Sequence, residues 1–157
     1  WREVIYSQSE KAYTLMKCGN FDQAVILYES IIPNYVEKGI HYYKPFFREA
    51  IQGIGYCKLF QAKRAFFNRE IDKSNMLIEE AKVKLHEANV LNQNSYILGG
   101  LGYITFLQKD YPQAKEYITK AYSLAEGDVW LKEMLADTNI FNIEEDQLFA
   151  KMLQELV

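Results

Sequence analysis

The side chains of this sequence best suited to metal binding or nucleophilic catalysis are two histidines and two cysteines. His86 begins a His-Glu-x-x segment like that of the H-E-x-x-H zinc motif, but Val90 stands where the second histidine would be required. Zinc needs three or four converging ligands, and no set of His and Cys has such a spacing. Cys18 and Cys57 form no CxxC pair and are interpreted as small buried hydrophobes, although a cysteine nucleophile paired with His41 or His86 remains an alternative. We therefore predict no metal site and no cofactor.

Other signatures of catalysis are also missing from the sequence. There is no G-x-S-x-G elbow, no G-x-G-x-x-G fingerprint and no P-loop. The glycine-rich segment 99–102 lies within a helical pattern and has no strand before it, so close helix packing explains it better than phosphate binding. The acidic pairs Glu79-Glu80 and Glu144-Glu145 would point about 100° apart on a helix, which favours a solvated face over a shared acid–base site. We expect that the chain is not an enzyme.

Composition and charge define the broad class of protein. The chain has 157 residues, of which 49% are hydrophobic and 25% charged, as in a soluble globular domain. No run of about 18 apolar residues is present, so we expect no membrane insertion. The net charge is −3, and residues 126–157 carry eight acidic residues against two lysines, a local charge of −6 that leaves +3 on residues 1–125. Nucleic-acid-binding proteins usually have a basic face, so this distribution argues against that class of partner.

Two further features concern the origin of the chain. Isolated cysteines are typical of a reducing compartment, and we expect a cytoplasmic protein. The chain begins at Trp1 and not at Met, so we expect it to be part of a longer protein.

Apolar residues recur at helical spacing along almost the whole chain, and we predict an all-α fold without strands. The segments are separated by turn signals such as Gly19-Asn20, Lys109-Asp110 and Gly127. The expected helices cover residues 1–18, 21–36, 46–67, a further stretch to 92 after a weak break at 68–74, 96–108, 111–125, 128–137 and 144–156.

The sequence also repeats part of its own pattern. A shift of 90 residues superposes Tyr6 on Tyr96, Tyr13 on Tyr103, Phe21 on Tyr111 and Ala24 on Ala114. A second shift, of 33 residues, superposes Ala81 on Ala114, Leu85 on Ile118 and Ala88 on Ala121. A period of roughly 34 residues that carries a helical hairpin is typical of tetratricopeptide repeats.

The chain resembles the tetratricopeptide repeat family most clearly at Gly19–Ala24 and at Tyr111–Ala114. In that family, a small residue on the first helix of a hairpin lets the second helix approach, and Ala12 and Gly102 match this role. An aromatic residue after the turn fills the hairpin, and an alanine on the second helix packs against the first. The residues that match these two roles are Phe21 and Tyr111, and Ala24 and Ala114.

The resemblance implies antiparallel helical hairpins stacked as a right-handed solenoid over residues 1–125, with hairpins at about 1–38, 45–92 and 95–126. The acidic helices of residues 128–157 are then expected to pack as a C-terminal cap. The middle hairpin is irregular, because Ala24 and Ala81 are separated by about 23 residues more than one repeat. Solenoids with an uncapped end often dimerise, so the expected cap favours a monomer over a homodimer.

The resemblance also implies a concave groove lined by the first helix of each hairpin. Tyrosine offers a large apolar area and a hydroxyl group at low entropic cost, which suits protein recognition. Alternatively, the same rings only pack between neighbouring first helices. The positions expected to line the groove are Tyr6, Tyr13, Lys17, Phe47, Ile54, Lys58, Tyr96 and Tyr103.

A second aromatic feature is the segment 41–48, His-Tyr-Tyr-Lys-Pro-Phe-Phe-Arg. It is either an exposed patch or a plug for the irregular middle hairpin. Together these features predict a non-enzymatic module that binds a peptide or helix of another protein, with no small-molecule substrate. Two alternatives stay open, namely the regulatory or sensor portion of a larger signalling protein and a small secretion chaperone.

Overall fold

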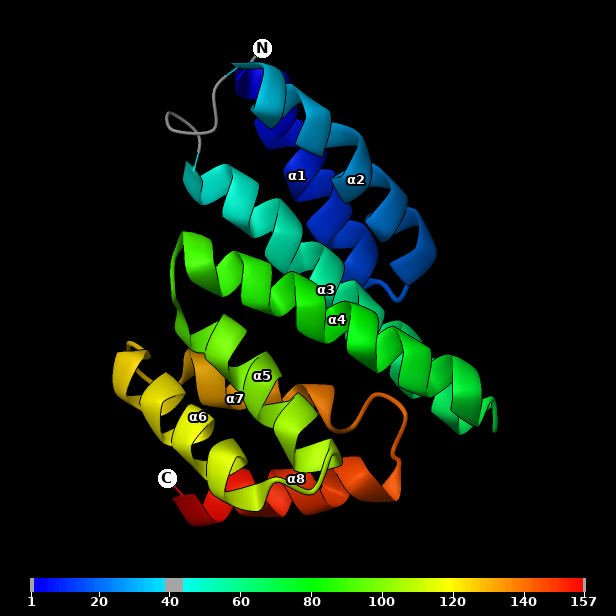
Figure 1. Ribbon diagram of the computed structural model, residues 1–157, viewed down its shortest axis with the longest axis vertical. Helices are drawn as coiled ribbons and strands as arrows, with labels where there is room; N and C mark the ends of the chain where they lie inside the picture. Colours follow the sequence, from blue (N-terminus) through cyan, green and yellow to red (C-terminus); the bar gives the residue numbers. More distant parts are fainter. Residues whose placement is uncertain (1, 39–43, 157) are drawn as a thin grey trace. The chain divides into compact units, whose positions relative to one another are not determined.

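The structure is a computed structural model that describes residues 2–38 and 44–156 (Figure 1). Within these residues the chain forms eight α-helices and no strand, which confirms the all-α prediction. The helices are α1 Arg2–Lys17, α2 Phe21–Lys38, α3 Lys44–Phe67, α4 Ile71–Leu91, α5 Ser95–Leu107, α6 Tyr111–Leu124, α7 Val129–Asp137 and α8 Glu144–Leu156. Of the aromatic segment 41–48, residues His41, Tyr42 and Tyr43 lie outside the described residues.

Three of the turns between helices have the same geometry. In each, one residue adopts the left-handed conformation, with φ of 86° at Gly19, 64° at Arg69 and 64° at Lys109. The next amide then donates to the carbonyl oxygen five residues earlier, which satisfies the end of the first helix. These bonds are Asn20 N to Leu15 O at 2.8 Å, Glu70 N to Ala65 O at 2.8 Å and Asp110 N to Thr105 O at 2.9 Å. The three turns therefore define three equivalent hairpins, α1–α2, α3–α4 and α5–α6.

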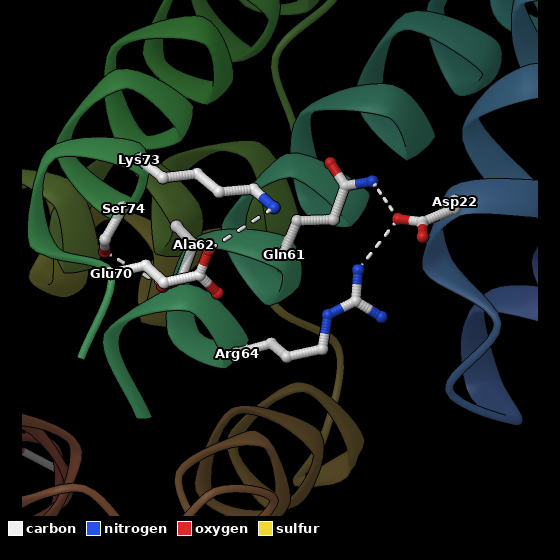
Figure 2. Close-up of polar contacts among 7 residues, drawn as sticks. All are labelled: Asp22, Gln61, Ala62, Arg64, Glu70, Lys73 and Ser74. Carbon is white, nitrogen blue, oxygen red and sulfur yellow. Dashed lines mark hydrogen bonds and ion pairs between the residues drawn. The ribbon is translucent and has the colours of Figure 1, made fainter. Parts of the chain in front are cut away.

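The equivalent hairpins place small residues where their two helices cross. Seven residues before each turn stands a buried small residue on the first helix, and five residues after it stands another on the second. The pairs are Ala12 with Ala24, Ala62 with Ser74, and Gly102 with Ala114. In the middle pair the Ser74 hydroxyl donates to the Ala62 carbonyl oxygen at 2.8 Å (Figure 2).

This geometry corrects the sequence-based register of the middle hairpin. The shift of 33 residues matched Ala81 to Ala114, whereas the turn geometry makes Ser74 the equivalent of Ala114. The two assignments differ by seven residues, which is two helical turns. Both therefore place the same face of the helix in the core, and the apolar pattern does not distinguish them. Helices α3 and α4 are longer than their counterparts, which accounts for the additional residues in this hairpin.

The described chain divides into two compact units, residues 1–92 and residues 93–157. In the first unit α3 packs against both α2 and α4. The rings of Phe21 and Phe60 stack at 5.1 Å between centroids and join α2 to α3. Gly53 on α3 leaves room for the Tyr28 ring of α2, because a Cβ at position 53 would clash with that ring. Helix α3 therefore lies between α2 and α4 in this unit.

The second unit contains α5 to α8. A Cβ at Gly102 would lie 2.6 Å from Ile118 Cδ1, so this glycine allows α5 and α6 to approach closely. Helix α8 contacts α5, α6 and α7. The predicted boundary at residues 125–128 therefore falls inside a unit, because the acidic helices pack together with the α5–α6 hairpin.

Candidate functional site

Two tyrosines lie on one exposed face of α1. Tyr6 and Tyr13 are seven residues apart, hence two helical turns, and their exposed fractions are 50% and 47%. Glu10 and Lys17 are exposed and occupy the same face at helical spacing. We call Tyr6, Glu10, Tyr13 and Lys17 the α1 strip. It offers two aromatic rings, a carboxylate and an ammonium group to the solvent.

Contacts within the α1 strip orient its side chains. The Lys17 Nζ atom lies 5.5 Å from the centroid of the Tyr13 ring, within cation–π range. A hydrogen bond with Glu10 raises the pKa of Tyr6, with smaller contributions from the charges of Glu10 and Glu49 and from burial. The Tyr6 ring also meets Phe46 of α3 edge to face, with centroids 6.2 Å apart. The α1 strip therefore borders the start of α3.

The three α3 positions predicted for the groove have different surroundings. Phe47 is half-buried near the start of the helix. Ile54 is completely buried, with an exposed fraction of 0%, so it presents no surface to a partner. Lys58 pairs with Glu80 of α4 at 3.1 Å between Nζ and Oε2. Ile54 therefore does not line an exposed groove, because α3 is covered by both α2 and α4.

The two α5 positions lie in the second unit. Tyr96 is half-buried, and Tyr103 is only 4% exposed. The Tyr103 hydroxyl donates to the Asp146 carboxylate of α8, and its ring meets Phe149 edge to face at 5.1 Å. The pKa of Tyr103 is raised well above its usual value by burial and by the adjacent Asp146 carboxylate. Tyr103 therefore belongs to an internal contact with α8, and neither of the two sequence-based interpretations anticipated this partner.

The turn geometry also identifies a tyrosine of the middle hairpin that the sequence analysis missed, at the position equivalent to Tyr6 and Tyr96. Tyr6, Tyr56 and Tyr96 each stand thirteen residues before the left-handed residue of their turn. Tyr56 is half-buried, and its ring lies 6.4 Å from Phe60. The turn at the left-handed Arg69 was not located from the sequence, because the break at 68–74 contains neither Gly nor Pro. The sequence analysis predicted Phe47, nine residues earlier, for this place.

Polar contacts fix the arrangement of α2, α3 and α4 close to the middle turn. The Asp22 carboxylate accepts hydrogen bonds from Gln61 Nε2 at 2.6 Å and from an Arg64 guanidinium nitrogen at 2.8 Å (Figure 2). These two bonds hold the pKa of Asp22 below its usual value, the Gln61 bond contributing most. At the start of α4, Lys73 Nζ lies 3.9 Å from the carboxylate of Glu70, the residue that precedes the helix (Figure 2). The contacts of Asp22 connect the first hairpin to the second and leave the α1 strip uninvolved.

The two cysteines, the remaining candidates for nucleophilic chemistry, differ in their exposure. Cys57 is fully buried, and burial raises the pKa of its thiol to about 12, which keeps it protonated at neutral pH. Cys18 is exposed at the end of α1, contrary to the expectation that both thiols are buried. Across residues 2–38 and 44–156, no three His, Cys, Asp or Glu side chains are grouped as metal ligands would be.

In the same residues, no helix has the length and apolar character needed to cross a membrane.

The chain matches no protein-family model, no curated protein and no solved structure.

Proposed function

We propose that the chain is a non-enzymatic, tetratricopeptide-like module that binds a helix or peptide of another protein on the α1 strip. The observation that carries this proposal is the half-exposed pair Tyr6 and Tyr13 on one face of α1, with Lys17 beside the second ring. Tyrosines combine a large apolar area with a hydroxyl group and lose little side-chain entropy on binding, so they are enriched where proteins recognise one another.

The proposed surface is smaller than the groove expected from the sequence. It consists of the α1 strip and the neighbouring ring of Phe46 on α3. Ile54 and Tyr103 are excluded because they are buried. Glu10 and Lys17 add one charge of each sign at the edge of the rings, which favours a definite orientation of the bound segment.

A photo-crosslinking experiment tests this proposal. The photoreactive amino acid p-benzoylphenylalanine replaces Tyr13 in one variant and Tyr122 of α6 in a matched control, since Tyr122 is 44% exposed. Both variants are irradiated in cells of the source organism, and adducts are identified by mass spectrometry. We expect a protein adduct at position 13 that is absent at position 122. The same adducts at both positions, or none at position 13, would contradict the proposal.

A further inference from the structure

The second unit contains an internal example of how a tyrosine on such a helix is covered. Tyr13 and Tyr103 each stand six residues before the left-handed residue of their turn, at Gly19 and Lys109. The two turns have the same hydrogen bonds, so both tyrosines occupy equivalent positions in their hairpins. Tyr103 is covered by helix α8 of its own unit, whereas Tyr13 is about half exposed.

Helix α8 covers Tyr103 with two side chains. Asp146 and Phe149 are three residues apart and therefore lie on one face of α8. Asp146 accepts the Tyr103 hydroxyl hydrogen bond, while the Phe149 ring lies 5.1 Å from Tyr103 and 5.4 Å from Phe106. The tyrosine face of α5 thus receives a carboxylate and, one helical turn later, an aromatic ring.

The α1 hairpin offers two exposed groups to a helix with the same two side chains. The first is the ring of Tyr13, because Met16, which stands where α5 has Phe106, is already buried. Lys17 stands where α5 has Leu107, so an ammonium group is added beside Tyr13. A carboxylate that accepts from the Tyr13 hydroxyl would also be attracted by Lys17. Glu10, the acidic member of the α1 strip, hydrogen-bonds with Tyr6 one turn further from Lys17.

We infer that the partner of the α1 strip is an amphipathic helix that carries Asp or Glu and, three residues later, an aromatic residue. The carboxylate binds the Tyr13 hydroxyl and the Lys17 ammonium group, and the aromatic ring packs on the exposed Tyr13 ring. This inference rests on the proposed function of the α1 strip and specifies the chemistry of its partner.

The chain's own α8 is committed to the second unit. Asp146, Phe149 and Leu153 are all almost completely buried there, so α8 would have to leave its unit before it could bind a second copy. The occupant of the α1 strip is therefore a helix of a different protein. The sequence of α8 nevertheless supplies a suitable probe, because it contains both recognition groups at the required spacing.

The test is a fluorescence anisotropy titration of the full chain against a labelled, end-blocked peptide of residues 143–156. We expect saturable binding with a Kd of about 10–100 µM, because a short peptide must order as a helix when it binds. Replacing Phe149→Ala in the peptide should weaken binding about tenfold. Replacing Asp146→Asn in the peptide should weaken it by roughly three- to tenfold.

Variants of the protein locate the bound peptide. Tyr13→Ala should weaken binding about tenfold, and the matched control Tyr122→Ala should leave it unchanged. Lys17→Gln should weaken binding of the native peptide but not of the Asp146→Asn peptide, because the ammonium group acts through the carboxylate. Circular dichroism checks that each variant keeps its helix content.

Each other outcome overturns the inference. Equal binding of the native and Phe149→Ala peptides would show that the aromatic ring is not recognised. Binding that is unchanged by Tyr13→Ala but increased by Asp146→Asn in the protein would place the peptide in the second unit, where it replaces α8. If the peptide does not bind while position 13 still crosslinks to a protein, the partner chemistry is wrong and the proposed function stands. If both experiments fail, both proposals fall.

Discussion

Helices α1 and α5 carry the same pair of tyrosines, but their surroundings differ. Tyr103 on α5 is covered by α8, which contributes a carboxylate and an aromatic ring. Tyr13 on α1, at the equivalent position, is about half exposed and lies beside Lys17. The same sequence pattern therefore forms an internal contact where the following chain supplies a helix, and an open surface in the other hairpin.

The largest expected difference between the two helices concerns truncation of the equivalent tyrosines. Tyr103→Ala should lower the free energy of unfolding by about 3–5 kcal/mol, because it leaves a cavity and removes one buried hydrogen bond to Asp146. Tyr13→Ala should cost less than about 1 kcal/mol, since its ring is half exposed. Urea denaturation of both variants measures the two values. Similar losses would show that the two tyrosines are not in different environments.

The equivalence of the two hairpins themselves is tested by overpacking their helix crossings. Ala24 and Ala114 both have exposed fractions of 0%. Replacing either residue, Ala24→Leu or Ala114→Leu, should lower the free energy of unfolding by about 1–3 kcal/mol. Thermal unfolding followed by circular dichroism gives the two melting temperatures. An unchanged melting temperature in either variant would contradict the assignment of that alanine to a helix crossing.

The buried Tyr103 should also make the free energy of unfolding depend on pH in the alkaline range. The pKa of Tyr103 is raised in the folded chain above its ordinary value of 10.0, mainly by burial and then by Asp146. The contribution of Tyr103 to the free energy of unfolding is fully present below a pH of about 10. It is lost as the pH rises above this value, because the tyrosine of the unfolded chain releases its proton first. This loss of stability with rising pH should be smaller in the Tyr103→Phe variant, as measured by urea denaturation at pH 9 to 11. An identical loss in both proteins would refute this contribution.

The smallest expected effect belongs to the middle hairpin. Ser74→Ala gives this crossing the residue that the other two hairpins have, and it removes one buried hydrogen bond to the Ala62 carbonyl oxygen. We expect a loss of about 0.5–1.5 kcal/mol in the free energy of unfolding, with no change in helix content. Chemical denaturation measures it, and Ser123→Ala on the exposed surface of α6 is the control. A loss of more than about 2 kcal/mol would show that Ser74 does more than form this one hydrogen bond.

The helices could be predicted from the sequence because their signals are local. Apolar residues at helical spacing, together with turn residues such as Gly19 and Gly127, defined the eight segments to within a few residues. The register of the middle hairpin could not be predicted, because a slip of two helical turns preserves the apolar face. Arg69 adopts the left-handed conformation there, and the sequence showed only a weak break at 68–74 that did not fix the position of the turn.

The candidate surface could be predicted only in part. The spacing of Tyr6 and Tyr13 predicts that they share one face of α1, but not that they are exposed, because the identically spaced Tyr96 and Tyr103 are half-buried and buried. The burial of Tyr103 depends on Asp146, which is 43 residues away, and no local pattern indicates such a contact. Ile54 is buried because α3 lies between two other helices, which again depends on tertiary packing.

The most direct test of the open α1 strip and the covered α5 face is an NMR titration of the isotope-labelled full chain with the peptide of residues 143–156. If the strip is the binding surface, chemical-shift changes should be centred on Glu10, Tyr13 and Lys17, while Tyr103 and Phe149 keep their free-state resonances. Shifts centred on Tyr103 and Phe149, with an unperturbed α1, would contradict this account, because the peptide would then compete for the face that α8 already covers.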